Sequence, residues 1–302
     1  MVPAELQANY VDALPVLGAH LRTQGDTEDA PLLLGQSHGG LEAATRRLES
    51  LWTRLRPLLA AGLKRQAAAA LLTTYAGAAS QHALQMALAT DAEVAAYEGT
   101  LLKIWETLAE RTADEKATLR LGLPARLGGA GAQWASTRRY AAFWAGWTAA
   151  AKEVQTDQGS ETLADLVDRL PNTAAKLTSA REGLASQGSP AGEGTSLAEA
   201  LSHHFRQRNF LIVAQKKNHA AHLQHLSTQE RACLLAAGGP GAGAFLQYPS
   251  EASCAMEDAL WSTALRQRLG HRRAECSQQQ LPRGSSNVQL QNPKRNQLQL
   301  QP

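Results

Sequence analysis

The stretch Leu123–Trp147, LPARLGGAGAQWASTRRYAAFWAGW, combines glycines and aromatics in a chain of which only 5% of residues are aromatic. Within it, Tyr140, Phe143, Trp144 and Trp147 recur at i, i+3, i+4 and i+7. That spacing places four rings on one face of a helix. The stretch therefore predicts a glycine-rich bend, followed by a helix that packs its aromatic face into a core.

The three glycines Gly128, Gly129 and Gly131 also invite comparison with a phosphate-binding loop. Such a loop follows a strand and opens a helix whose backbone N–H groups face the phosphate. The preceding residues 112–124, TADEKATLRLGLP, lack the pattern of a buried strand, and no Lys-Ser or Lys-Thr pair follows the glycines. We therefore expect the glycines to form a bend that packs against neighbouring helices.

The aromatic residues have a second interpretation, as a platform on which nucleic-acid bases stack. Base stacking requires exposed rings interleaved with cations. Arg138 and Arg139 lie immediately beside these aromatics. Because the same spacing is that of one buried helical face, we favour the core and keep the platform as the alternative.

The overall composition favours helices. Hydrophobic residues make up 44% of the chain, and its apolar segments use Ala and Leu, which are strong helix formers, rather than β-branched residues. The predicted fold class is mainly α, an irregular helical bundle. We add a short N-terminal β-hairpin that pairs Leu14–Leu21 with Leu32–Leu34, and a disordered, Gln-rich C-terminal tail.

Local signals place the helix ends. Apolar residues recur at three- and four-residue steps from Gly40 onward, and Pro57 is expected to bend or end the first helix. Asp91 is expected to cap the helix that starts there, and STQE at Ser227–Glu230 is a capping box. Further helices are predicted at residues 61–87, 91–109, 163–170, 196–226 and 255–269.

These elements suggest a division of the chain into five parts. The predicted hairpin lies within residues 1–40, and a first helical domain covers residues 41–182. The Gly- and Ser-rich residues 183–195 are predicted to be a flexible linker. A second helical region with a basic face covers residues 196–272, and the tail covers residues 273–302.

The net charge of +3 is small, so the clustering of the charges matters more than their sum. The densest basic stretch is HHFRQRNFLIVAQKKNHAAHLQH, His203–His225. A helix with this face would neutralise several phosphates and bind RNA or DNA without sequence preference, although a merely solvated face is the alternative. The predicted nucleic-acid-binding residues are Arg46, Arg47, Arg138, Arg139, Arg206, Arg208, Lys216 and Lys217.

Catalytic and metal-binding patterns are weak. His219, His222 and His225 recur every three residues, but no Cys or carboxylate stands at a helpful spacing from them. The sequence has no adjacent Asp pair to hold two divalent ions, and spacing identifies no Ser/His/Asp or Cys/His set. We therefore predict that the chain is not an enzyme and has no metal site, no cofactor and no small-molecule substrate.

The cysteines and the N-terminus bear on location. Three cysteines without paired spacing argue against a secreted disulfide scaffold. The first residues, MVPAELQANY, lack a signal peptide, and no apolar run is long enough to span a bilayer. We expect an intracellular protein, nuclear or cytosolic, without a membrane partner.

Four segments together resemble a known family. They are LPVLGAHL at 14–21, LPARLGGAG at 123–131 with AAFWAGW after it, LLAAGGPGAGAFLQYPSE at 234–251, and LWSTALRQRLG at 260–270. In this order they resemble the region just beyond the polymerase core in reverse transcriptases of non-LTR (LINE-type) retrotransposons. The resemblance covers most of residues 10–272.

The resemblance implies a C-terminal, post-polymerase segment that lacks the catalytic palm. Residues 1–40 would be a remnant of the palm, and residues 41–182 a thumb-like domain. The family's catalytic Asp-Asp turn would lie upstream of Leu14. Cys276 would be the first ligand of its Cys/His cluster, but the tail supplies no second Cys. Only structural positions carry over, namely Pro124, Arg126, Gly128, Gly129 and Gly131.

The predicted function is therefore that of a non-catalytic retrotransposon fragment with at most weak, sequence-nonspecific binding of RNA or DNA. The alternative is an α-helical protein-interaction scaffold with no nucleic-acid role. Helices that once packed on a palm would expose apolar surface, so we also expect oligomers or aggregation.

Overall fold

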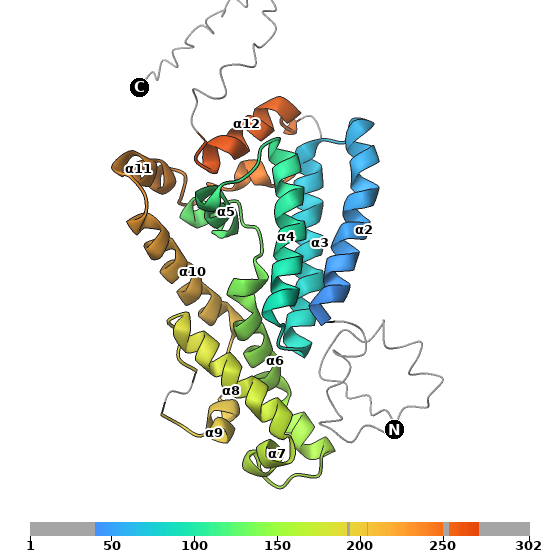
Figure 1. The fold of residues 1–302 in the computed structure, drawn as a ribbon, viewed down its shortest axis with the longest axis vertical. Helices are drawn as coiled ribbons and strands as arrows, with labels where there is room; N and C mark the ends of the chain where they lie inside the picture. The colour runs from blue at the N-terminus through green and yellow to red at the C-terminus, as the bar shows by residue number, and fades with distance from the viewer. Residues whose placement is uncertain (1–39, 192–193, 204, 250–253, 272–302) are drawn as a thin grey trace, which may run out of the picture. The chain divides into compact units, whose positions relative to one another are not determined.

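The computed structural model describes residues 40–191, 194–203, 205–249 and 254–271, and over these ranges it is helical without strands (Figure 1). The mainly α fold class is thereby confirmed. The predicted hairpin at 14–34 and the predicted tail at 273–302 lie outside the described residues. Within the described part, every helix is too short or too polar to cross a bilayer.

The first hydrophobic core lies among α2 (Gly40–Ala60), α3 (Arg65–Met86), α4 (Asp91–Ala109) and α12 (Asp258–Arg268), of which α2, α3 and α4 run side by side (Figure 1). Between Gln66 and Met86, α3 carries no Asp, Glu, Lys or Arg, which lets it pack between α2 and α6 (Ala135–Asp157). The large, fully buried side chains of this first core include Leu41, Leu48, Leu72, Leu84, Tyr97, Ile104, Leu108, Leu121 and Trp261.

The second core lies among α6 (Ala135–Asp157), α7 (Leu163–Arg169), α8 (Pro171–Ser186), α9 (Leu197–Ser202) and α10 (Gln207–Gln224). The aromatic stripe predicted for α6 points into it.

The rings of Phe143, Trp144 and Trp147 are only 2%, 0% and 4% exposed. Tyr140 is partly buried and packs against Gly183 of α8, where an added Cβ would meet its ring at 2.5 Å. The prediction of a buried aromatic face is confirmed. The alternative of a base-stacking platform is wrong, because rings packed inside the protein cannot reach a base.

The predicted helix at 196–226 is wrong in one respect, because the chain forms two helices, α9, which ends at Ser202, and α10, which begins at Gln207. Leu201 and Phe210 are both buried in the second core. Nine residues of continuous helix would rotate these two side chains about 180° apart. The break lets both of them face the same core.

The N-terminal cap of α4 also differs from the prediction. Thr90, not Asp91, is the cap, and it forms a capping box with Glu93. Asp91 is the first residue of the helix and pairs with Arg139, with 2.6 Å between Oδ1 and Nη1. The capping box predicted at Ser227 is confirmed, and it opens α11 (Thr228–Ala236).

The two prolines Pro57 and Pro171 lie at different places in their helices. Pro57 lies inside α2, which continues to Ala60, whereas Pro171 begins α8. Helix α8 extends to Ser186, into the segment 183–195 that was predicted to be a linker, and Ala191 is buried in the second core. The division of the chain at this segment stays a prediction.

The glycine-rich bend follows α5 (Glu115–Gly122) and a turn of 3-10 helix, η2 (Ala125–Leu127). Its N–H groups are used within the protein. Gly128 donates to the Ala125 carbonyl at 3.0 Å, Gly129 to that of Pro124 at 3.2 Å, and Gly131 to that of Leu123 at 2.9 Å. These N–H groups therefore do not form a phosphate cradle.

Two of these glycines are required by close approach of the backbone. Gly128 has a φ of +86°, and a Cβ there would lie 2.5 Å from the Leu234 carbonyl oxygen. A Cβ on Gly129 would overlap the Leu123 carbonyl and lie 2.5 Å from that of Arg120. The bend thus packs tightly against α5 and α11.

Arg268, at the end of α12, ties this bend to a second glycine-rich loop. Its guanidinium donates to the carbonyl oxygens of Ala125 at 2.6 Å, Gly129 at 2.6 Å and Ala242 at 2.7 Å. It also lies 5.5 Å from the ring centroid of Phe245, in the 3-10 turn η3 (Ala244–Leu246). Arg268 is 7% exposed, and burial lowers its pKa.

The clash at Gly129 yields a testable prediction. Gly129→Ala should destabilise the protein by about 2–4 kcal/mol, because the new methyl group overlaps fixed backbone carbonyls. Gly99→Ala is the matched control, since Gly99 lies within α4 and a Cβ there meets nothing within 4 Å. The control should be neutral or stabilising by up to about 1 kcal/mol. Urea unfolding followed by circular dichroism measures both, and equal effects would contradict the packing described.

A second prediction concerns Arg268. Arg268→Met keeps the apolar stem but removes the donors of the Gly129 and Ala242 carbonyl oxygens and one of the two donors of the Ala125 oxygen, which keeps the Gly128 N–H. This should lower the free energy of unfolding by about 3–5 kcal/mol. Arg266→Met is the control, because among the described residues the side chain of Arg266 hydrogen-bonds Thr263 of its own helix, at 3.1 Å, and binds no loop carbonyl. A loss for Arg268→Met no larger than that of the control in thermal unfolding would argue against this role.

Candidate nucleic-acid interface

The segment from Arg206 to Gln224 presents exposed fixed cations without neighbouring acids in the sequence. Residues 200–229 contain neither Asp nor Glu. Arg206 precedes the first turn of α10 and Arg208 lies in it, and both are exposed. Lys216 and Lys217 are exposed two turns later. The structure therefore keeps all four predicted cations of this segment on one element.

The four cations differ in whether their charged groups already make hydrogen bonds or ion pairs within the protein. Lys217 donates a hydrogen bond from Nζ to the carbonyl oxygen of Ser186, at the end of α8. Within the described part of the chain, Arg206, Arg208 and Lys216 have no hydrogen bond or ion pair at their charged groups. Because their charges are not compensated locally, these three side chains are free to contact an anion.

Arg46 and Arg47 form a separate basic patch on α2. Both are exposed, and Arg46 lies 3.8 Å from Glu42 one turn earlier on the helix. The pKa of His82 on α3 is lowered by burial and, to a smaller extent, by the charge of Arg47. In Figure 1, α2 and α10 lie on opposite sides of α4, so the structure does not join the two patches into one surface.

Arg138 and Arg139 on α6 are engaged inside the protein. Arg138 donates to Ser80 Oγ at 3.2 Å and to Gln81 Oε1, both on α3, and burial lowers its pKa. Arg139 pairs with Asp91, and it also donates to the Ala89 carbonyl at 3.3 Å. Both arginines fasten α6 to its neighbours, and their predicted role in binding nucleic acid stays a prediction.

The motif positions lie near the basic segment. Arg126 donates from Nη2 to Gln215 Oε1 on α10 at 2.9 Å, and its carbonyl accepts from Gly239 N–H at 2.9 Å. The Pro124 carbonyl accepts from Leu127 N–H at 2.8 Å. The side-chain hydrogen bond of Arg126 therefore links η2 to the middle of α10.

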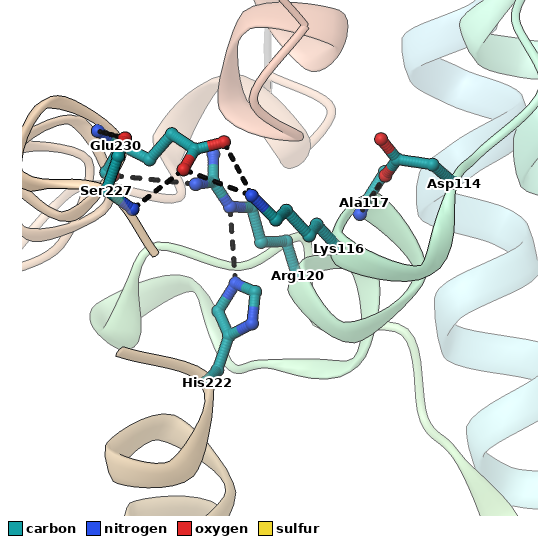
Figure 2. Close-up of polar contacts among 7 residues, drawn as sticks. All are labelled: Asp114, Lys116, Ala117, Arg120, His222, Ser227 and Glu230. Atoms are coloured by element: carbon teal, nitrogen blue, oxygen red, sulfur yellow. Dashed lines mark hydrogen bonds and ion pairs between the residues drawn. The ribbon is translucent and has the colours of Figure 1, made fainter. Parts of the chain in front are cut away.

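The C-terminal end of α10 is anchored by a polar junction that joins α5, α10 and α11 (Figure 2). Arg120 on α5 donates from Nε to Nε2 of His222 at 3.4 Å. Lys116, one turn earlier, donates to both carboxylate oxygens of Glu230 at 3.0 and 3.1 Å. The same carboxylate caps α11 by accepting from Ser227 N–H at 2.8 Å.

Burial and charge set the protonation of this junction. His222 is only 2% exposed. Its pKa is lowered first by burial and then by the charges of Arg120, His219 and Lys116, against a smaller opposing effect of Glu230. The pKa of Glu230 is lowered to about 2 by its hydrogen bonds to Ser227 and Lys116. At neutral pH the junction therefore contains a neutral imidazole and an ionised carboxylate.

Sequence reasoning missed this junction. From the sequence alone, His222 was considered only as one of three regularly spaced histidines that form a weak metal-binding pattern, and Arg120 was assigned no role. The two residues are 102 positions apart, and no local pattern marks them as partners. Among the described residues, no group of three or more His, Cys, Asp or Glu is arranged to hold a metal ion.

Comparison of the chain with protein-family models, with curated proteins and with solved structures found no match. The resemblance to the retrotransposon family therefore stays a prediction from the residues. What the site can do chemically is defined by its exposed cations, which can attract and bind phosphate oxygens.

The lowered pKa of His222 predicts a pH dependence of stability. The unfolded chain binds a proton more readily than the folded one, so this stabilisation is present above about pH 6.5 and is lost as the pH falls below that value. His219 and His82, whose pKa values are also lowered, act in the same direction. The free energy of unfolding, measured by urea titration between pH 7.5 and pH 5, should decrease.

His222→Gln should make that decrease smaller, because the group that takes up the proton is gone. His225→Gln is the control, since His225 is exposed at the C-terminal cap of the same helix. If His225→Gln reduced the decrease as much as His222→Gln does, the buried imidazole would not be its source. Parallel curves for the wild type and His222→Gln would rule out the junction as its source.

Proposed function

We propose that this chain binds the phosphate backbone of RNA or DNA without sequence preference, through the exposed cations Arg206, Arg208, Lys216 and Lys217. The observation that carries the proposal is the combination of four exposed cations on one element with the absence of acids in residues 200–229. Attraction to phosphate depends on such local clustering, because oppositely charged neighbours would cancel it.

The aromatic residues of the segment argue for backbone contacts rather than base contacts. Phe210 is buried and Phe205 is partly buried, and their rings lie 5.2 Å apart in the second core. Neither ring is available for stacking on a base. Binding would therefore come from the cations and be weak and strongly dependent on salt.

The proposed contact set is smaller than the predicted one. Arg138 and Arg139 are left out because their guanidinium groups already bind α3 and α4. Arg46 and Arg47 on α2 would form a second contact for a strand long enough to reach both patches. The proposal assigns no catalytic role to any residue.

We further propose that the chain is a post-polymerase fragment of a non-LTR retrotransposon reverse transcriptase-like protein. Support comes from the four similar segments and from the contacts among three of them. Arg268, in the segment 260–270, binds carbonyl oxygens in 123–131 and in 234–251. Segments that pack against one another are expected to occur together in one protein. This fits the resemblance of all three segments to the same family.

The alternative function, a protein-interaction scaffold, has one observation in its favour. The outer face of α3 exposes Leu71 by 51% and Tyr75 by 43%, one helical turn apart. With Thr74 and Ala78 exposed beside them, this face has no charged residue. Such a surface suits contact with another protein more than contact with phosphate.

Binding of a 20-nucleotide single-stranded RNA at about 50 and about 200 mM salt tests the proposal. Four phosphate contacts predict a loss of affinity of about 50-fold over this range. The double variant Arg208→Glu/Lys216→Glu should weaken binding at low salt. It should also reduce the slope of affinity against salt concentration to the value for about two phosphate contacts.

The control is Lys152→Glu/Lys176→Glu, which makes the same number of charge reversals at exposed lysines on α6 and α8. Equal losses in the two double variants would mean that only the net charge matters. No binding by the wild type at either salt would disprove the nucleic-acid function and leave the scaffold.

A further inference from the structure

A cavity of about 270 Å³ lies where the C-terminal turns of α2 and α4 meet the first turns of α3 and α12. Its walls combine aromatic and aliphatic side chains with a few charged groups. It is separate from the basic segment on α10, and none of the residues proposed to bind nucleic acid lines it.

The apolar part of the cavity is held in place by the first core. Leu108 is buried, while Trp52 and Leu59 are partly buried and pack against the same core. The cavity lining therefore includes an apolar part, which contains the indole of Trp52 and is packed against the first core.

Two charged residues of the cavity lining, Arg65 and Asp258, are engaged in hydrogen bonds within the protein. Arg65 donates its backbone N–H to Asp258 Oδ1 at 3.0 Å. Its guanidinium donates to the Leu108 carbonyl at 3.1 Å, to Ser262 Oγ at 3.2 Å and to the carboxylate of Glu110. Because Arg65 and Asp258 make these bonds within the protein, we do not assign them to ligand binding.

Arg56 is different. It lines this cavity and an adjoining hollow beside Thr53 and Pro57, and its side chain is exposed. The acids near the cavity are already engaged, since Glu110 binds Arg65 and Glu257 binds Lys64 at 2.9 Å. Within the described residues, Arg56 has no hydrogen bond or ion pair, so its charge is free to bind an anion at the mouth.

We propose that this cavity binds a small aromatic carboxylate. The ring packs between Trp52 and Leu59 above Leu108, and the carboxylate pairs with the guanidinium of Arg56. A cavity of about 150 Å³ is enough to hold one benzene ring. A volume of about 270 Å³ therefore fits a carboxylate built on one ring or on two fused rings. Arginine binds carboxylates through two parallel hydrogen bonds, which favours this anion.

Isothermal titration calorimetry of the full chain with 2-naphthoate tests the proposal, with uncharged 2-naphthylmethanol as the ligand control. The carboxylate should bind at least about tenfold more tightly than the alcohol, because only the carboxylate pairs with Arg56. Equal affinities for the two ligands, or no heat at millimolar 2-naphthoate, would overturn the proposal.

Two pairs of variants locate the site. Arg56→Glu should weaken binding at least about tenfold, whereas Arg54→Glu, an exposed neighbour outside the cavity lining, should leave it unchanged. Ala60→Trp should abolish binding by filling the cavity from an exposed position, and Ala61→Trp, one residue outside the lining, should not.

Circular dichroism confirms that each variant is folded. Equal losses in both members of either pair would show that the ligand binds elsewhere or through net charge alone. The result is independent of the nucleic-acid experiment, because that experiment changes residues on α6, α8 and α10, none of which lines the cavity.

Discussion

The buried guanidinium of Arg268 joins three parts of the chain that are far apart in the sequence. It donates to carbonyl oxygens of the bend after α5 and of the loop before η3, and it lies at the end of α12. Taking an arginine out of water is costly unless its donors are satisfied. Here backbone carbonyls supply the acceptors, and those of Gly129 and Ala242 need donors because they lie outside regular helices.

The glycines make this arrangement sterically possible. The two loops approach each other so closely that Gly239 N–H bonds the Arg126 carbonyl, and a Cβ on Gly238 would lie 2.9 Å from the same oxygen. Side chains at such positions would push the loops apart and move the acceptors away from Arg268. Gly128, Gly129 and Gly238 thus have a packing role. The N–H groups of Gly128, Gly129, Gly131, Gly238 and Gly239 bond carbonyl oxygens within the protein.

The arginines show how environment separates structural from binding cations. Arg138 and Arg268 are largely withdrawn from solvent and bound to neutral acceptors, which holds helices and loops together. Arg208 and Arg56 are exposed and unpaired within the described residues, which leaves their charge for a ligand. An identical side chain therefore stabilises the fold in one place and offers an anion site in another, according to burial and neighbours.

The sequence by itself determined the features that depend on neighbouring residues. The helical class follows from Ala and Leu, the buried face of α6 from its i, i+3, i+4 spacing, and the start of α11 from the capping box at Ser227, because each arises within a turn or two of helix. Tertiary structure alone decided the break between α9 and α10, the pairing of Arg120 with His222, the clamp of Arg268 and the cavity beside Arg56. Each of these depends on which segments meet across a hundred or more residues, or on which side chains share one core, and no local pattern encodes such a meeting.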